Sequence, residues 1–441
     1  MRVLCSTAST VVLVPRRVPF VASLVAVAFG LAVASPEPAH AAGRLPASNA
    51  VVFDPHDSKG VLVRTTFGLL SSRDGGGTWR WICDQAIGSP ETDEPPWVVT
   101  PKGTIVGATS TGVVASRDGG CSFTRSTEVL KGLVVRQNGE LLGVASTAAG
   151  ESRFDNHLLV SKDDAQAFAV DGGPIDPTLG VDSVAIAASE PGRIYLAGRR
   201  GEGVGSFVAS YDGGMSWLPR KLDLVAGETP IVAGVDPANA DRVYVRTTGE
   251  AVHARLLVTS DAGKTWRKVF DAPSETLGFA LSDDGKRAFV GTREGVSSSP
   301  SDAFAFTKGS SIEARCLAAS GSTLWACSTE KSGFFVGSSR TGGRSFDANL
   351  HLEEIKGPLE CPNSTTVAKQ CVDAWPKLRR ELGLPDVGDA PPSVGGGGGS
   401  PSLRGRATRT GRAVNMRMAA VGIALFGFAA YSALKRLRRR R

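Results

Sequence analysis

The sequence predicts an all-β protein, a seven-bladed β-propeller followed by a small disulfide-stapled helical C-terminal cap, a linker and a transmembrane helix. Three observations lead to this fold class: a short motif that returns seven times, strand-like segments around every copy, and apolar segments near both ends of the 441 residues. The 53 glycines and the many short Val, Ile and Leu runs broken by Gly, Asp and Pro are typical of a turn-rich β protein.

The repeated motif places an Asp five positions before an aromatic residue that follows a small residue. Its first copy, SRDGGGTW, ends at Trp79. Four further copies end at Phe123, Phe168, Trp217 and Trp266, and two degenerate copies end at Phe306 and Phe346. The copies lie about 40 to 49 residues apart, which is the length of one four-stranded propeller blade. The repeat therefore predicts seven blades.

The surroundings of each copy predict the four strands of a blade. An apolar run, a turn and a second apolar run precede each motif, as in WVVTPKGTIVGA and FALSDDGKRAFVG. A third short run ends at the first residue of the motif, and the aromatic residue begins a fourth. Seven such units predict a propeller over residues 42–355.

The motif resembles the Asp-box, or BNR repeat, of sialidases, sortilins, xyloglucanases and photosystem II assembly factors. The resemblance implies that the Asp accepts backbone N–H bonds across the hairpin between the third and fourth strands, and that the aromatic residue packs between blades. The Asp-box residues are Asp74, Asp118, Asp163, Asp212 and Asp261. Gly permits the positive φ angles of such a turn. The glycines of SRDGGGTW are therefore expected to shape a hairpin and not a nucleotide loop.

The residues give little support to catalysis. A sialidase-like site would need a Tyr nucleophile, but Tyr195 and Tyr244 occupy a second-strand position and Tyr211 lies inside a motif. A xyloglucanase-like site would need two facing acids, usually between two propellers. The loop carboxylates Asp93, Glu94 and Asp155 have no spacing that brings two of them together. We expect no catalytic residue, no cofactor and no metal, and keep a glycoside hydrolase as the alternative.

A binding function is the first hypothesis, because propeller loops on one face commonly hold ligands. The loops at 146–157, 199–205 and 248–255, in blades three to five, are longer than those of blades one and two. These loops predict a patch for a protein or glycan ligand, unless they are solvated loops of varying length. The candidate ligand-binding residues are Arg153, Arg199, Arg200, His253 and Arg255.

The charge distribution argues against nucleic acid as a partner. The formal net charge is +7, but residues 401–441 contain eleven Lys or Arg and no acidic residue. Between residues 42 and 400 acidic side chains outnumber basic ones. The predicted propeller therefore has no basic surface of the kind that nucleic acids require.

Both ends of the chain predict export and membrane attachment. Residues 1–41 have the pattern of a signal peptide, with an uncleaved anchor as the alternative. A linker at 385–415, a transmembrane helix at 416–434 and a basic cytoplasmic tail at 435–441 follow the cap. We expect an exported protein, either anchored in the inner membrane and facing the periplasm or placed at the cell surface. Removal of the tail as a sorting signal is the second possibility.

Six cysteines remain after residue 41, and an even number in an exported chain indicates disulfides. Cys316 and Cys327 flank a short turn symmetrically and are expected to pair. Cys361 is expected to pair locally with Cys371, which leaves Cys83 for Cys121. Apolar residues at helical spacing from Val367 predict a helix in the cap at 356–384, with a kink or restart at Pro376.

Overall fold

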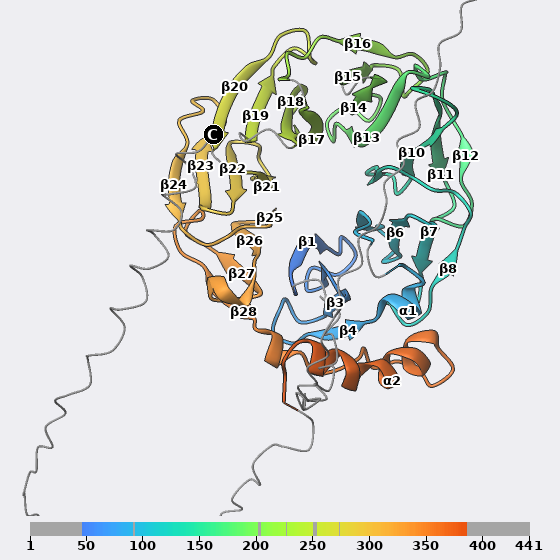
Figure 1. Cartoon of the computed structure of the whole chain (residues 1–441), viewed down its shortest axis with the longest axis vertical. Helices are drawn as coiled ribbons and strands as arrows, with labels where there is room; N and C mark the ends of the chain where they lie inside the picture. Colours follow the sequence, from blue (N-terminus) through green and yellow to red (C-terminus); the bar gives the residue numbers. More distant parts are fainter. Residues whose placement is uncertain are drawn as a thin grey trace, which may run out of the picture. The chain divides into compact units, whose positions relative to one another are not determined.

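A computed structural model describes residues 46–385, except for 91–92, 202–203, 226, 250–253 and 273. The described residues form seven four-stranded antiparallel sheets, arranged as the blades of a ring (Figure 1). The predicted seven-bladed β-propeller is confirmed. The predicted signal peptide, most of the predicted linker, and the segments predicted as a transmembrane helix (416–434) and a basic tail (435–441) lie outside the described residues. Among the residues that are described, no helix is long and apolar enough to cross a membrane.

Each blade is built from one continuous segment of chain. Blades one to three contain β1 (Ser48–Phe53), β2 (Val61–Thr65), β3 (Gly68–Ser72) and β4 (Arg80–Ile82); β5 (Trp97–Val99), β6 (Ile105–Thr109), β7 (Gly112–Ser116) and β8 (Thr124–Arg125); β9 (Leu133–Val135), β10 (Leu141–Ala148), β11 (Phe154–Ser161) and β12 (Ala169–Val170). Blades four and five contain β13 (Leu179–Ile186), β14 (Ile194–Arg200), β15 (Val204–Ser210) and β16 (Leu218–Arg220); β17 (Thr229–Asp236), β18 (Asn239–Thr248), β19 (Ala254–Thr259) and β20 (Arg267–Ala272). Blades six and seven contain β21 (Thr276–Leu281), β22 (Arg287–Thr292), β23 (Gly295–Pro300) and β24 (Thr307–Ser310); β25 (Cys316–Ser320), β26 (Thr323–Cys327), β27 (Val336–Ser339) and β28 (Asp347–Leu350).

The antiparallel order divides the connections between two faces of the ring. The turns between the first and second strands of a blade, and between its third and fourth strands, lie on one face, which we call the hairpin face. Gly75 N donates to Lys59 O at 2.9 Å, which places two such turns of blade one side by side. The second-to-third strand loops and the connections between blades lie on the opposite face, the loop face. The short helix α1 (Asp84–Ile87) belongs to one of these connections.

Aromatic side chains fill the spaces between blades. The indole of Trp79 is 1% exposed and donates to Asn349 O of blade seven at 3.1 Å. Phe207 of blade four packs edge-on against Trp266 of blade five, with ring centroids 4.9 Å apart. Burial of such large apolar surfaces is the main stabilising contribution at each junction between blades.

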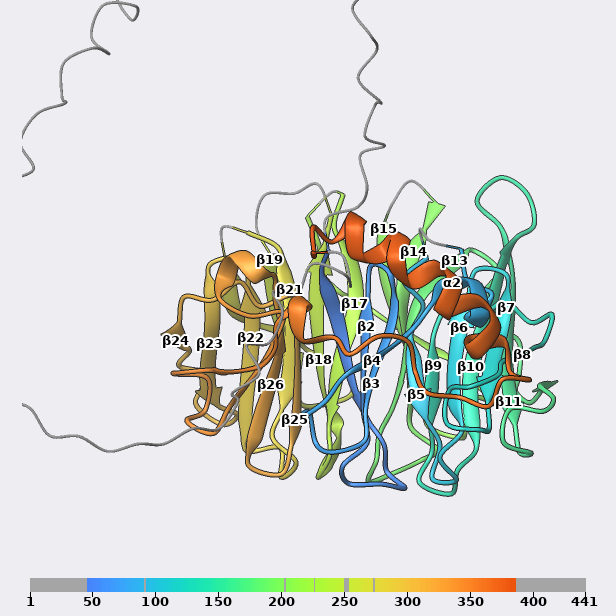
Figure 2. The same ribbon diagram turned by 90° about the horizontal axis from the view of Figure 1, so that it is seen from below.

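A C-terminal strap, residues 356–381, continues from blade seven across the outside of blades one and two (Figure 2). Trp81 N donates to Gly357 O at 2.8 Å, and Leu359 N donates to Trp81 O at 2.7 Å. The strap therefore adds a short parallel edge to β4 before it reaches blade two. Among the described residues, blades one and seven share no strand. The strap therefore adds backbone hydrogen bonds between blade one and the segment that follows blade seven, where the ring closes.

The strap ends in one helix, α2 (Thr366–Glu381), which runs through Pro376 without a restart. The Thr365 hydroxyl accepts the Ala368 N–H and caps its first turn. Trp375 packs against Trp81 of β4, with ring centroids 5.6 Å apart. The side chain of Val372, which the apolar spacing places with the buried residues, is 56% exposed. Two 3₁₀ turns, η2 (Glu330–Ser332) and η3 (Leu352–Glu354), complete the described elements.

The disulfides differ from two of the three predicted pairs. Cys316 pairs with Cys327 across β25 and β26, as predicted. Cys83 pairs with Cys371 and Cys121 with Cys361, so the predicted pairs Cys361–Cys371 and Cys83–Cys121 are wrong. The physical reason is the path of the strap, which carries its two cysteines past blades one and two and away from each other. Both bonds therefore join the strap to the propeller.

Candidate functional site

The motif carboxylates on the hairpin face are used in their own turns. Asp74 accepts the N–H groups of Gly77 and Thr78 at 2.9 and 2.8 Å, and the hydroxyls of Ser72 and Thr78 at 2.7 Å. Equivalent hydrogen bonds occur in four other turns. In each, the hydroxyl two residues before the Asp and the N–H four residues after it donate to the Asp carboxylate. These carboxylates are Asp118, Asp163, Asp212 and Asp261. The Thr78 N–H, with the Ser72 hydroxyl, lowers the pKa of Asp74 to about 2. These carboxylates are therefore structural acceptors.

Two glycines of the opening motif adopt positive φ, 76° at Gly75 and 93° at Gly76. A Cβ on Gly76 would also lie 2.7 Å from the indole of Trp325 in blade seven. The glycine is thus required both by the turn and by the close approach of the neighbouring blade. The two glycines therefore shape the hairpin turn between β3 and β4, as predicted.

The lowered pKa values of the motif carboxylates make the stability of the fold depend on pH. Hydrogen bonds from Ser216 lower the pKa of Asp212 from 3.8 to about 2, and the pKa of Asp261 is also lowered to about 2 despite some burial. A carboxylate with a depressed folded-state pKa stabilises the fold above its unfolded pKa, and this contribution disappears as the pH falls through the folded pKa. We expect the thermal midpoint to fall between pH 4 and pH 2. Asp212→Asn should show a shallower fall, measured by circular dichroism, and an equal slope in variant and parent would contradict the assignment.

The loop face is raised over blades three to five. Counted from the residue that pairs with the first motif residue, β10, β14 and β18 extend over eight, seven and six residues toward the loop face, whereas β2 and β6 extend over five each. The longer strands carry the loops that the sequence singles out. In blade four, Val204 faces Arg200 across the β14–β15 ladder and is 58% exposed. Val225, in the connection to blade five, is 59% exposed.

Two of the candidate arginines, Arg199 and Arg200, lie at the end of β14 and are ion-paired. Arg200 forms an ion pair with Asp176 at 2.6 Å and donates to the Ser206 hydroxyl at 2.8 Å. Arg199 lies 3.3 Å from Asp182, and burial raises the pKa of that carboxyl although Arg199 opposes the shift. Arg199 keeps 56% of its side chain exposed, so it remains accessible to a ligand.

Arg255 has a structural place in the fold. It forms two bonds to the carboxylate of Glu228, whose side chain is 3% exposed. Glu228 also accepts the Val225 N–H at 2.8 Å and the Thr247 hydroxyl at 3.1 Å. This cluster fastens the connection between blades four and five to β18 and β19. The sequence could not reveal it, because Glu228 lies outside the repeated pattern.

Arg153 and His253 complete the predicted patch. Arg153 lies in the β10–β11 loop with an exposed side chain. A Cβ on Gly201 would lie 2.9 Å from the Ser152 hydroxyl, so the loop carrying Arg153 reaches blade four. His253 lies outside the described residues. The structure thus brings Arg153 near the end of β14, while Arg255 is engaged in its ion pair.

The residues considered for catalysis are placed in local contacts. Asp93, in the connection between blades one and two, accepts the Ser110 N–H at 2.6 Å. Asp155 lies 2.9 Å from His157, and both belong to β11 of blade three. Tyr195 and Tyr244 are fully buried, and Arg193 lies 4.0 Å above the ring of Tyr211. Within the described ranges no group of three or more His, Cys, Asp or Glu could hold a metal ion.

Comparisons with known proteins yield structural similarities only. No family model matches the chain, and no curated protein matches it. An ancestral GH74 enzyme is 15% identical with a TM-score of 0.37, over 67% of this chain and 36% of that one. YCF48 bound to D1 peptide is 16% identical with a TM-score of 0.38, over 56% and 75%. A nidogen/laminin complex is 8% identical with a TM-score of 0.41, over 57% and 95%. The chain thus spans about a third of the GH74 enzyme, and these similarities carry no argument about function.

Proposed function

We propose that this chain is an exported, non-catalytic binding propeller, tethered to a membrane through its C-terminal segment, that holds a protein or glycan ligand on its loop face. The observation that carries the proposal is the raised edge of blade four, which combines exposed apolar and basic side chains. We call Arg153, Arg199, Arg200, Val204 and Val225 the blade-four rim. Three disulfides, two of them linking residues far apart in the chain, support an oxidising location.

A glycoside hydrolase is less well supported by the geometry. Such an enzyme needs two carboxyl groups on either side of the scissile bond, roughly 5–10 Å apart. Asp93 and Asp155 belong to different blades and each has a local partner. The exposed valines and the arginines of the rim instead suit a surface that is partly apolar and partly charged.

Site-specific photo-crosslinking in producing cells tests the proposal. A photoreactive residue at position 204 should give a discrete adduct with a protein ligand. The same residue at position 170 is the matched control, because Val170 is 59% exposed but lies on the outer strand β12. A glycan array, probed with residues 42–384 and with the variant Val204→Asp, tests for a carbohydrate ligand. Equal labelling at both positions without array binding, or turnover of a fluorogenic glycoside, would contradict a non-catalytic binding rim.

A further inference from the structure

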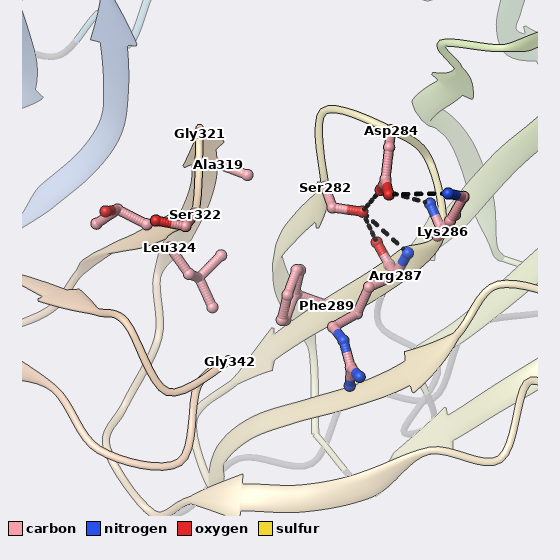
Figure 3. A pocket seen from close by; sticks show the side chains of 11 residues that line it. Ser282, Asp284, Lys286, Arg287, Phe289, Ala319, Gly321, Ser322, Leu324 and Gly342 are labelled. Carbon is pink, nitrogen blue, oxygen red and sulfur yellow. Dashed lines mark hydrogen bonds and ion pairs between the residues drawn. The ribbon is translucent and has the colours of Figure 1, made fainter.

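A cavity of ≈ 330 Å³ opens on the hairpin face between blades six and seven. Arg287 and Phe289 project from the same side of β22, and Leu324 of β26 faces them (Figure 3). The rest of the wall includes Ser322 and Gly321 from the β25–β26 turn. The cavity therefore has an apolar base and a guanidinium at its edge, and it lies on the face opposite the blade-four rim.

The junction between blades four and five provides a comparison, because ionic and hydrogen-bond contacts between the two blades fill the equivalent space there. Arg193, just before β14, forms an ion pair with Asp241 of blade five, with 2.7 Å between Nη1 and Oδ1. Tyr195, two residues further, donates its hydroxyl to Ala240 O at 2.7 Å. A cation from one blade thus meets a carboxylate from the next, and a tyrosine hydroxyl meets the adjacent carbonyl.

The strand registers identify the equivalent residues at the junction of blades six and seven. Ile194 and Ala288 each pair with the first residue of the following motif, Ser210 and Ser299. Arg287 and Phe289 therefore stand where blade four has Arg193 and Tyr195. Val243 and Leu324 pair in the same way with Thr259 and Ser339. Ser322 and Gly321 therefore stand where blade five has Asp241 and Ala240.

The junction between blades six and seven thus lacks the carboxylate and the phenol that close the junction between blades four and five. Nearby acids do not replace the carboxylate. Asp284 bonds to Ser282 at 2.6 Å and lies 3.6 Å from Lys286, and Asp283 accepts the Gly321 N–H at 2.8 Å. In the part of the chain that the structure describes, no side chain bonds to the Arg287 guanidinium.

The adjoining motif of blade seven also lacks its acid. Thr341 occupies the position of the motif Asp, and its hydroxyl accepts the Ser345 N–H at 3.0 Å. Gly342 of this turn lines the cavity. The loss of the motif carboxylate removes one negative charge from the edge of the cavity. Asp284 and Lys286 also line the cavity and are 3.6 Å apart, so their opposite charges offset each other. The guanidinium of Arg287 is then the unbalanced charge, which favours an anionic ligand there.

We propose that this cavity binds a carboxylate carried on an apolar group. The carboxylate takes the place that Asp241 has at the earlier junction and bonds to Arg287, which a planar guanidinium can do with two N–H groups. The apolar group lies against Phe289 and Leu324, in a volume at the lower end of the range for small-molecule sites. A free organic acid and the C-terminal residue of a peptide share this chemistry.

Calorimetric titration of the purified full-length chain tests the proposal with 3-phenylpropionate as probe. Its amide, 3-phenylpropanamide, controls for the charge. We expect the acid to bind, and the amide to bind roughly ten- to a hundredfold more weakly, since a hydrogen bond between charged groups is lost. A short peptide ending in a free phenylalanine carboxylate distinguishes the sources. Tighter binding of the peptide indicates a chain terminus, and equal or weaker binding indicates a free acid.

Two variants and one control variant test whether the acid binds in this cavity. Arg287→Gln should abolish binding of the acid, whereas Arg293→Gln, an exposed residue of the same blade on the loop face, should retain it. Ser322→Asp should restore the missing ion pair, and so abolish binding while the thermal midpoint rises or stays unchanged. The proposal is overturned by absence of binding to the parent chain, by equal binding of acid and amide, or by unchanged binding in Arg287→Gln. A lower midpoint in Ser322→Asp would likewise refute the equivalence of the two junctions.

Discussion

Removal of both strap disulfides is expected to produce the largest loss of stability in this protein. Cys83–Cys371 and Cys121–Cys361 close segments of 288 and 240 residues, which include almost the whole propeller. Replacing either pair by serine should lower the free energy of unfolding by about 3–4 kcal/mol, because the other bond still restrains the unfolded chain. Replacing both pairs should cost more than the sum of the two, since no covalent link then joins the strap to blades one and two.

The third disulfide is the matched control. Cys316–Cys327 joins neighbouring strands of one blade and closes only 11 residues, for which the loop-closure cost is about 3 kcal/mol. Urea unfolding, followed by tryptophan fluorescence, compares the variants. If the variant without either strap disulfide unfolds at the same urea concentration as the one without Cys316–Cys327, the strap does not hold the ring closed.

The strap explains why two of the three disulfide predictions failed where the blade prediction succeeded. A blade is a local structure, so the turn chemistry at Asp74 and the alternation of apolar runs specify it within about 45 residues. The path of residues 356–381 is a single long-range event that occurs once in the chain. Sequence proximity made Cys361 and Cys371 the obvious pair, but the edge that the strap adds to β4 sends them to different blades.

The candidate site shows the same limit. The arginines of blades three to five are visible in the sequence, but their acidic partners Asp176 and Glu228 lie in connections that share no pattern. The cavity between blades six and seven is different, because the sequence itself contains the pattern that predicts it. An alignment of the β17–β18 and β25–β26 turns places Ser322 at the position that corresponds to Asp241, and the register of the strands supports this alignment.

The ion pair of Glu228 and Arg255 gives the second large effect. The side chains are 3% and 17% exposed, so neither charge is well solvated. Glu228→Gln preserves shape but removes the charge, and leaves Arg255 largely buried without its carboxylate. Breaking a buried pair in this way should lower the free energy of unfolding by about 3 kcal/mol. Arg255→Gln should have a similar cost, because Glu228 is then the unpaired charge.

The comparison with Arg153 decides whether Arg255 has a structural role or a ligand-binding role. Arg153→Gln changes an exposed side chain and should alter stability by less than about 0.5 kcal/mol. Chemical denaturation of the three single variants and of Glu228→Gln/Arg255→Gln measures the coupling between the two residues. A double variant that costs much less than the sum of its single variants supports the ion pair. If Arg255→Gln unfolds like the parent, the pair does not stabilise the connection between blades four and five, and Arg255 returns to the candidate ligand-binding residues of the loop face.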